Sequence, residues 1–280
     1  MRAMVWAVLR QPSLALGLFL LSLLFAMAIA APFVYPGSPW DMAGAPFTPP
    51  GDAEFPLGTD SLGRDVAAAI AHGAPVSLLI GGVSTLVALT MGIMLGAVAG
   101  YAGGRVDDAV MRFAEFFQTI PSFVLAVVLV AIFRPSLGSI VAAIAIVSWP
   151  PVARVTRAEF MTLRQREFVQ AARVLGHSTP SIIFRTILPN ALSPVIVLAS
   201  LMIATAILTE SALSFLGLGD PNRMSWGFMI GSGRSVIRLA WWVSVFPGIS
   251  IFITVLGLNL VGEGLNTLLN PRLARRRPVA

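Results

Sequence analysis

Long apolar runs alternate with short polar segments along most of this sequence. Six of the runs are long enough and sufficiently free of charge to cross a bilayer, which takes about 20 mostly apolar residues. They cover residues 14–35, 76–101, 116–133, 138–155, 191–216 and 242–265. The runs are much longer than the strands of a membrane β-barrel, and they lack the alternation of such strands. The pattern therefore predicts an all-α membrane protein with about six transmembrane helices.

Three of the runs carry more specific expectations. The third and fourth are separated only by residues 134–138, so we expect them to form a tight antiparallel helical hairpin. The first follows two arginines and ends in Ala28-Ile29-Ala30, which resembles a cleavable signal peptide. Its apolar part, residues 14–31, is longer than the roughly 7–15 residues usual in such a peptide. We expect this run to be retained as a membrane anchor.

Composition agrees with a membrane protein. Charged residues make up 11% of the 280 residues, against about 25% in ordinary soluble domains, and the mean hydropathy is +0.84. The chain has no cysteine, which excludes disulfides, thiolate metal sites and a cysteine nucleophile. All 19 basic residues are arginine.

The arginines predict the orientation, because basic residues gather on the cytoplasmic side of a membrane protein. With a cytoplasmic N-terminus, fourteen of the nineteen arginines fall inside and only Arg64, Arg134, Arg223, Arg234 and Arg238 fall outside. Both termini are then cytoplasmic. The expected parts are an N-terminal segment (1–13), a transmembrane domain (14–266) with outer segments 36–73 and 217–241 and a cytoplasmic loop 154–190, and a basic tail (267–280).

The expected cytoplasmic loop 154–190 has a helical pattern of its own. Its apolar positions recur at helical spacing and predict one apolar face, formed by Leu163, Phe168, Ala171, Ala172 and Leu175. Gly176 then favours a left-handed helix end, and Pro180 favours the start of a second short helix that ends near Pro189. Such a helix pair fits two roles equally, lying on lipid headgroups or binding a groove on a cytoplasmic partner.

This loop resembles the E-A-A-x3-G-x9-I-x-L-P motif of the permease subunits of ABC importers. The positions in register are Gln170, Ala171, Ala172, Gly176, Leu188 and Pro189. Gln170 stands where the motif has glutamate, which removes a charge, and Thr186 stands where it has isoleucine.

A second segment resembles one branch of that family. Residues 56–65 read PLGTDSLGRD, which is similar to the P-L-G-T-D-x-x-G-R-D signature of the dipeptide/oligopeptide/nickel branch. The signature positions are Gly58, Thr59, Asp60, Gly63, Arg64 and Asp65, on the expected outer side. Further elements of the branch recur at 213–217, 226–227, 241–242 and 246–248. The resemblance covers essentially the whole chain and is greatest to the branch's C-type permease subunit.

The resemblance implies the fold and the setting of a type I ABC importer permease in the bacterial inner membrane. Such a chain forms half of a pathway for di- or oligopeptides, with nickel or another small solute as the alternative substrate. The implied partners are a second homologous permease, two ATPase subunits and an extracytoplasmic substrate-binding protein. The loop positions from Gln170 to Pro189 would couple transport to the ATPases.

The chain itself has no G-x-x-x-x-G-K-[ST] sequence and no lysine. We therefore expect no ATPase activity and no cofactor on this chain, with ATP and Mg²⁺ bound by the partner ATPases. Two other classes of function remain: a secondary transporter that works alone, and a membrane enzyme. The first would be expected to carry ionisable residues at mid-membrane, and the second a nucleophile with its base.

Several single residues carry expectations of their own. Glu210, toward the outer end of the fifth run, is a candidate pathway or gate residue, or else a capped interfacial residue. Thr59 and Asp60 are expected to cap a helix, with contact to the binding protein as the alternative role. Arg64 and Asp65 are expected to pair locally or with the second permease.

Other residues have simpler interpretations. Trp241 and Trp242 fit an aromatic belt at the membrane surface. His72 and His177 fall on opposite sides of the membrane, so no metal site is expected from them. The remaining acidic residues of interest are expected in a solvated loop or at a helix start; they are Asp107, Asp108 and Glu115.

Overall fold

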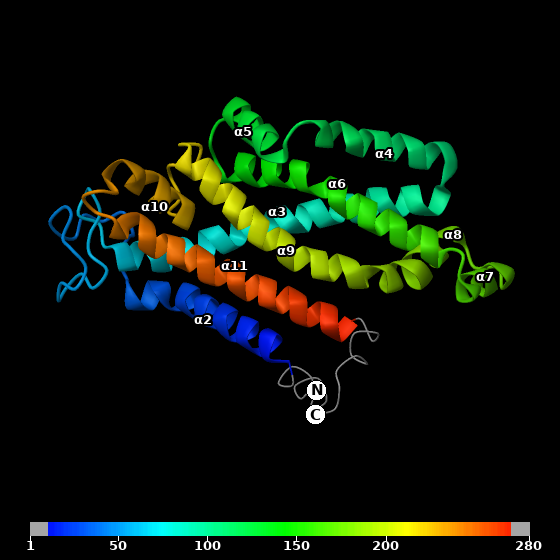
Figure 1. The fold of residues 1–280 in the computed structure, drawn as a ribbon, viewed down its shortest axis with the longest axis horizontal. Coiled ribbons are helices and arrows are strands. Elements are labelled where there is room, and N and C mark those ends of the chain that lie inside the picture. Colours follow the sequence, from blue (N-terminus) through cyan, green and yellow to red (C-terminus); the bar gives the residue numbers. More distant parts are fainter. Residues whose placement is uncertain (1–10, 270–280) are drawn as a thin grey trace.

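The computed structural model describes residues 11–269, and every regular element in this part of the chain is helical (Figure 1). The elements are α2 (Pro12–Val34), α3 (Val66–Ala102), α4 (Gly104–Thr119), α5 (Ser122–Phe133), α6 (Leu137–Leu163), α7 (Glu167–Val174), α8 (Thr179–Ser181), the π-helix η1 (Ile182–Ile187), α9 (Leu188–Phe215), α10 (Trp226–Gly233), the 3₁₀-helix η2 (Arg234–Val236) and α11 (Trp242–Leu269). Within residues 11–269, five helices are long and apolar enough to span a membrane, or six if the bent pair α4–α5 counts as one span. The prediction of an all-α membrane fold with about six spans is confirmed.

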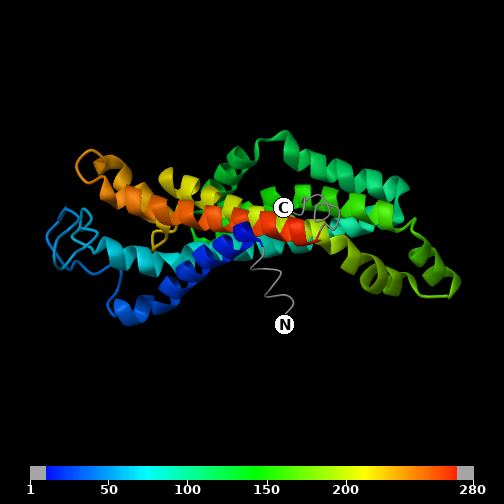
Figure 2. The same cartoon turned by 60° about the horizontal axis from the view of Figure 1, so that its bottom comes forward.

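The long helices run side by side along the long axis of the molecule, with α3 packed against α6, α9 and α2 (Figures 1 and 2). The α3–α6 contact is close because glycine recurs every fourth residue on the facing side of α3. A Cβ atom built on Gly92, Gly96 or Gly100 would meet α6 within 3 Å. Small residues allow this approach, and van der Waals packing then holds helices together in lipid.

The first helix, α2, lies antiparallel to α11 and packs closely against it. A Cβ on Gly17 would lie 2.8 Å from the carbonyl oxygen of Gly257, and a Cβ on Gly264 would lie 2.5 Å from Cβ of Leu14. The helix continues without a break through Ala28–Ala30. The described start of α2 and the described end of α11 therefore lie near each other (Figure 1).

The third predicted span is wrong as one continuous helix. The chain breaks between α4 and α5, whose axes meet at 82°. Ile120 at the break is extended (φ −96°, ψ 132°) because the following Pro121 disfavours helical backbone at the residue before it. The second half of the predicted hairpin is present, since Ala126 and Val130 of α5 pack against Ile140 of α6.

Several boundaries also differ from the expected ones. α3 begins at Val66 rather than near residue 76, so the end of the expected outer segment 36–73 is helical. α6 runs to Leu163, into the expected loop 154–190. The predicted segment 1–13 and tail 267–280 lie mostly outside the described residues.

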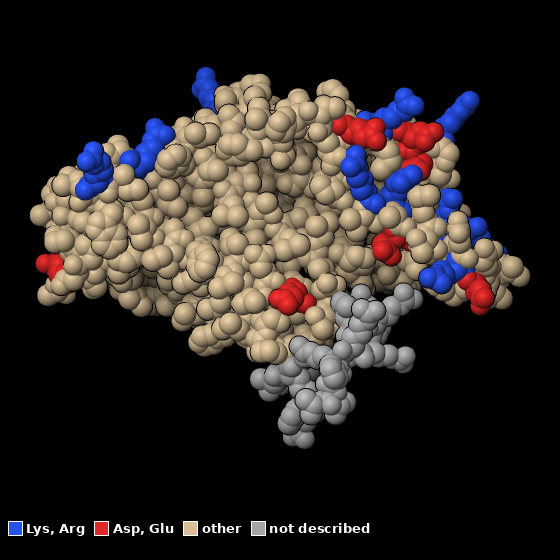
Figure 3. Space-filling view, viewed as in Figure 1, with Lys and Arg blue, Asp and Glu red and all other residues tan. Residues whose placement is uncertain are grey.

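Charged side chains are concentrated toward the two ends of the molecule (Figure 3). Most of the basic side chains in this view gather at the end formed by α7, α8 and the start of α4, with fewer at the opposite end near α10. The uneven distribution agrees with the arginine bias from which the orientation is predicted.

Candidate functional site

Helix α7 forms a tip that projects beyond the long helices (Figures 1 and 2). The chain leaves the helix through Leu175 and Gly176, and the φ of Gly176, +78°, is the left-handed conformation that glycine adopts most readily. The amide of His177 donates to the carbonyl of Ala172 (3.1 Å), and the amide of Gly176 donates to the carbonyl of Arg173 (3.0 Å). These two bonds make a Schellman motif, so the predicted glycine bend is confirmed.

The second loop helix does not stop at Pro189. α8, η1 and α9 follow one another without a gap, so Thr179–Phe215 is one long helical stretch. The π-helical segment lies just before Pro189, and the amide of Leu188 donates to the carbonyl of Ile183, five residues back. The predicted boundary at Pro189 is therefore wrong, and a local change of helical register takes its place.

The inner face of the tip packs onto the ends of the long helices. Val169 and Ala172 are buried in a cluster with Phe160. Tyr101 at the end of α3 lies next to two arginines. Its backbone carbonyl accepts a hydrogen bond from Arg164 (3.0 Å), and its ring faces the guanidinium of Arg173, 5.6 Å from the ring centroid.

The outer face of the tip is apolar and exposed. Phe168, Val174, Leu175 and Phe184 are exposed by 44%, 89%, 76% and 64%, and Ala171 lies among them on α7. We call these five residues the apolar tip. The predicted apolar face of the loop is therefore divided: Leu163 and Ala172 pack inward, whereas Phe168, Ala171 and Leu175 are exposed. Large apolar side chains exposed together on a short projecting segment typically mark an interaction site.

The other motif positions of the loop differ in exposure. Gln170, Gly176 and Pro189 are exposed, whereas Leu188 is partly buried against the inner cluster. Val169 on α7 is buried, and the sequence pattern missed it. Its spacing of three residues from Ala172 was the available signal.

The PLGTDSLGRD segment holds the chain between α2 and α3 onto the helices. Thr59 is fully buried, its hydroxyl donates to the carbonyl of Ala45 (2.6 Å), and it accepts from the amide of Thr48 (2.8 Å). The indole of Trp242 donates to the carbonyl of Thr59 (3.0 Å). Gly58, with φ +78°, lies so close to Trp242 that a Cβ would be 2.9 Å from its Nε1.

The charged residues of this segment bond locally. Asp60 accepts from the amides of Leu62 and Arg64 (2.8 and 2.9 Å), and the guanidinium of Arg64 lies over the Trp40 ring at 4.8 Å. Asp65 caps α3 by accepting from the amide of Ala67 (2.8 Å). Burial raises the pKa of the Asp65 carboxyl, while the backbone hydrogen bonds oppose that rise.

These contacts correct two expectations. The helix cap is Asp65 rather than Thr59 and Asp60, which stabilise the turns before it. Gly63 belongs to the same turns, because its carbonyl accepts from the amide of Gly44 (2.9 Å). Trp242 is also buried against the outer segment, whereas Trp241 is 49% exposed and fits a belt position.

Glu210 lies in a packed contact between α9 and α10. Its side chain is 2% exposed, and its Oε1 accepts from the hydroxyls of Ser214 (2.9 Å) and Ser225 (2.7 Å). Ser225 in turn caps α10 by accepting from the amide of Phe228. Gly227 fits against the carboxylate, since a Cβ there would lie 2.6 Å from Oε2. Glu210 therefore joins the two helices.

Asp107 lies in the first turn of α4, so the expected helix start is confirmed, but its side chain is not solvated. Asp107 is 6% exposed, and both of its carboxylate oxygens accept from Arg157 of α6. Asp108 and Glu115, by contrast, are exposed. The described residues contain no group of three metal-ligating side chains, and Nε2 of His72 lies 2.9 Å from the carbonyl oxygen of Tyr35.

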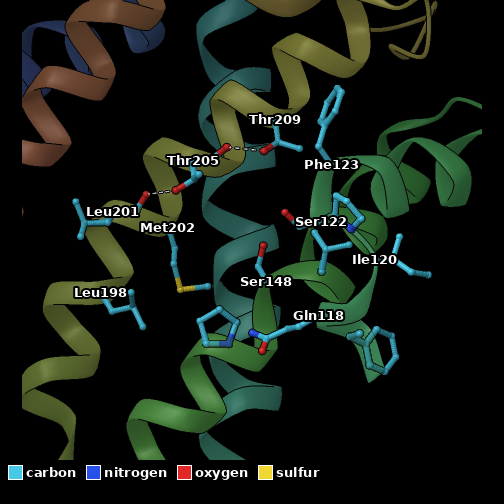
Figure 4. Close-up of a pocket in the computed structure, with 14 residues that line it drawn as sticks. Gln118, Ile120, Ser122, Phe123, Ser148, Leu198, Leu201, Met202, Thr205 and Thr209 are labelled. Carbon is cyan, nitrogen blue, oxygen red and sulfur yellow. Dashed lines mark hydrogen bonds between the residues drawn. The ribbon is translucent and has the colours of Figure 1, made fainter. Parts of the chain in front are cut away.

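A cleft opens where α4 and α5 part, against α6 and α9 (Figure 4). Its volume is about 480 Å³. The lining residues come from all four helices and the break between α4 and α5: Phe117, Gln118, Ile120, Pro121, Ser122, Phe123, Val147, Ser148, Pro151, Leu198, Leu201, Met202, Thr205 and Thr209. None of these described lining residues is charged, and Glu210 is not among them. Sequence reasoning missed the cleft, although Pro121 marked the break.

Comparison with known proteins agrees with this architecture. Residues 92–275 match the family described as binding-protein-dependent transport system inner membrane component. The chain is 44% identical to the di/tripeptide transport system permease protein DppC of Pseudomonas aeruginosa, over 92% of this chain and 87% of the relative. It is 37% identical to the dipeptide transport system permease protein DppC of Bacillus subtilis, over 96% and 85% of the two chains.

The fold is also similar to a solved one. A chain of the MetNI methionine ABC transporter, in an inward-facing conformation, matches with a TM-score of 0.60 at 17% identity, covering 72% of this chain and 96% of that chain. The sequence matches and the fold lead to the same conclusion: this chain belongs to the family of binding-protein-dependent transport system inner membrane components, the permease subunits of ABC importers.

Proposed function

We propose that this permease subunit forms half of an import pathway for di- or oligopeptides. The observation that carries the substrate class is the similarity over nearly the whole chain to permeases named for di/tripeptide and dipeptide transport. Nickel is the weaker alternative, because the described residues offer no cluster of metal-ligating side chains. The setting is the bacterial inner membrane, with both termini in the cytoplasm.

The apolar tip is the surface that binds a cytoplasmic ATPase subunit. Phe168, Val174 and Leu175 are exposed on α7 and its C-cap, beyond the long helices, and Phe184 is exposed near the start of the Thr179–Phe215 stretch. An ATPase groove would remove their apolar area from water. The inner face of α7 is packed against the helix ends, so a push on the tip is transmitted to α3 and α6 through Tyr101 and Phe160. Gln170, Ala171 and Gly176 would contact the ATPase, whereas Ala172 and Leu188 hold the tip in place.

The remaining subunits follow from this assignment. ATP and Mg²⁺ bind the two ATPase subunits, and this chain holds no cofactor of its own. A second homologous permease completes the pathway, and an extracytoplasmic binding protein delivers the peptide to the outer segments.

The test is uptake of radiolabelled dialanine by cells that lack this chain and receive a variant copy. Leu175→Asp places a charge in the apolar tip and is expected to lower uptake at least tenfold while the protein still reaches the membrane. Leu175→Met keeps an apolar side chain of similar volume and is the matched control, expected near wild-type uptake. Wild-type uptake by Leu175→Asp would contradict the assignment of the tip, and no dialanine uptake by the wild-type chain would contradict the substrate class.

Ala172 is not the position at which to make this test. Its side chain is 7% exposed and faces the inner cluster. A charged residue there is expected to unfold the tip itself, so a loss of transport would not report on docking alone.

A further inference from the structure

We propose that the cleft between α4, α5, α6 and α9 is where the transported peptide contacts this chain, as an uncharged site that binds the peptide backbone. The proposal rests on the proposed function and adds the site of contact and the chemistry that recognises the substrate.

The cleft lies at mid-depth in the bundle. Leu137 and Phe215 mark the ends of α6 and α9 nearer α10, and these ends are joined because Asp220 accepts a hydrogen bond from the amide of Leu137 (2.8 Å). Ser148 and Thr205 line the cleft ten or eleven residues from those ends, which is about 15 Å at the helical rise of 1.5 Å per residue. Half of a hydrocarbon layer of about 30 Å is the same distance.

A broken helix at this depth does not face lipid. The break leaves the last carbonyl groups of α4 and the first amides of α5 without helical partners, and no side chain caps α5. Unpaired backbone groups are tolerated within a membrane only when they are buried in protein or line a water-filled cavity. Ser122 and Gln118 on either side of the break are exposed rather than packed inside this chain.

The exposed side of α4 supports the same conclusion. Asp108, Arg112 and Glu115 lie one helical turn apart and are all exposed, and Glu115 is four residues before the end of the helix. Charged side chains on a lipid-facing helix surface cost about 2.5–3.5 kcal/mol each near the membrane centre. This cost applies to Glu115, which lies about 6 Å along the helix from the end of α4 that borders the cleft, whereas Asp108 and Arg112 lie nearer the basic end. The surface around Glu115 and the cleft therefore faces water or another subunit.

The lining fits a peptide rather than an ion. Gln118, Ser122, Ser148, Thr205 and Thr209 offer amide and hydroxyl groups that can hydrogen-bond a peptide backbone, and the described lining residues carry no charge to hold a metal or to select one charged side chain. The hydroxyls of Thr205 and Thr209 donate to the carbonyls of Leu201 (2.5 Å) and Thr205 (2.8 Å) on α9 itself, so these two oxygens are available to a peptide as acceptors (Figure 4).

The apolar part of the lining fits varied side chains. Leu198, Leu201 and the flexible Met202 present adaptable apolar surface on the α9 wall. The volume of about 480 Å³ lies in the range of about 300–1,000 Å³ typical of small-molecule sites. A neutral site with this lining binds what different short peptides share, which is their backbone.

The absence of cysteine from the natural chain makes the proposal directly testable. Single-cysteine variants Ser122→Cys, Ser148→Cys and Thr205→Cys place a thiol in the cleft of the assembled transporter. Matched controls are Phe25→Cys on α2 and Phe252→Cys on α11, which are exposed by 52% and 65% on the other side of the bundle, and the fully buried Ala88→Cys. The probe is a charged, membrane-impermeant maleimide applied to membrane vesicles of either orientation.

We expect the cleft thiols to react at least tenfold faster than the three controls in one vesicle orientation. Dialanine is expected to slow this reaction at least threefold, and free alanine is expected not to. Cleft thiols that react no faster than the controls would overturn the proposal while leaving the proposed function intact, if dialanine uptake persists. Fast labelling that dialanine does not slow, in vesicles that do take up dialanine, would overturn the peptide contact.

Discussion

At the residue scale, glycine positions decide how closely α3 and α6 can pack. Replacing Gly96 with alanine places a methyl group 2.8 Å from Cβ of Thr156, so α6 must shift. Gly82 on the same helix has open space around its Cβ position. Because alanine is a better helix former than glycine by about 0.5–1 kcal/mol, Gly82→Ala is expected to raise the melting temperature and Gly96→Ala to lower it. Thermal unfolding in one detergent compares the two, and equal shifts would contradict the packing argument.

A second prediction at the residue scale concerns Glu210, which is interpreted either as a contact between two helices or as a gate. As a contact between α9 and α10, it depends on the Ser225 hydroxyl, so Glu210→Ala and Ser225→Ala should each cost about 1–3 kcal/mol of stability. The double variant should cost clearly less than the sum, because both changes remove the same interaction. Melting temperatures of the four proteins test this. Unchanged stability of Glu210→Ala with altered transport would instead favour a gate.

At the element scale, the Asp107–Arg157 pair fixes α4 to α6 and so holds one wall of the cleft. Asp107→Ala leaves Arg157 without its partner, and because that arginine is partly exposed we expect a loss of only about 1–3 kcal/mol. The neighbouring Asp108→Ala is the matched control and is expected to change stability by less than about 0.5 kcal/mol. The exchange of both charges, Asp107→Arg with Arg157→Asp, should recover part of the loss. Equal unfolding transitions for Asp107→Ala and Asp108→Ala would contradict this role.

The elements also show what sequence reasoning can and cannot provide. Apolar runs located the spans of α2, α9 and α11, because a helix in lipid must be apolar on most faces. Apolar composition alone did not reveal the break at Pro121, since the run 116–133 is apolar on both sides of it. Local signals were reliable where one residue decides the backbone, as at Gly176. Partners that are distant in sequence, such as Asp107 with Arg157, could not be predicted because the pairing depends on how helices pack.

The sequence located the two motifs, but their physical roles depend on the packed structure. The register of the loop motif located the tip, but only the packed structure separates the inward-facing Ala172 from the exposed Leu175. The PLGTDSLGRD segment was recognisable from its letters alone. Its physical role, holding the outer segment onto α3 and α11 through Thr59, Asp65 and Trp242, depends on contacts up to 183 residues apart.

At the scale of the whole molecule, one end carries an exposed apolar tip, the middle a neutral cleft, and the other end a folded outer segment. This arrangement suits a subunit that passes a solute along its long axis and receives force at one end. The side with the cleft and the charged face of α4 is left open by this chain alone. We expect the second permease to cover it.

The most direct test of the account is purification of the tagged chain from its native membrane in mild detergent, with the accompanying proteins identified by mass spectrometry. The proposed importer assembly predicts recovery of one or two ATPase subunits, a second permease and a binding protein. It also predicts that Leu175→Asp loses the ATPases and retains the second permease. Recovery of this chain alone, under conditions that keep a known ABC importer intact, would contradict the account and favour a transporter that works by itself.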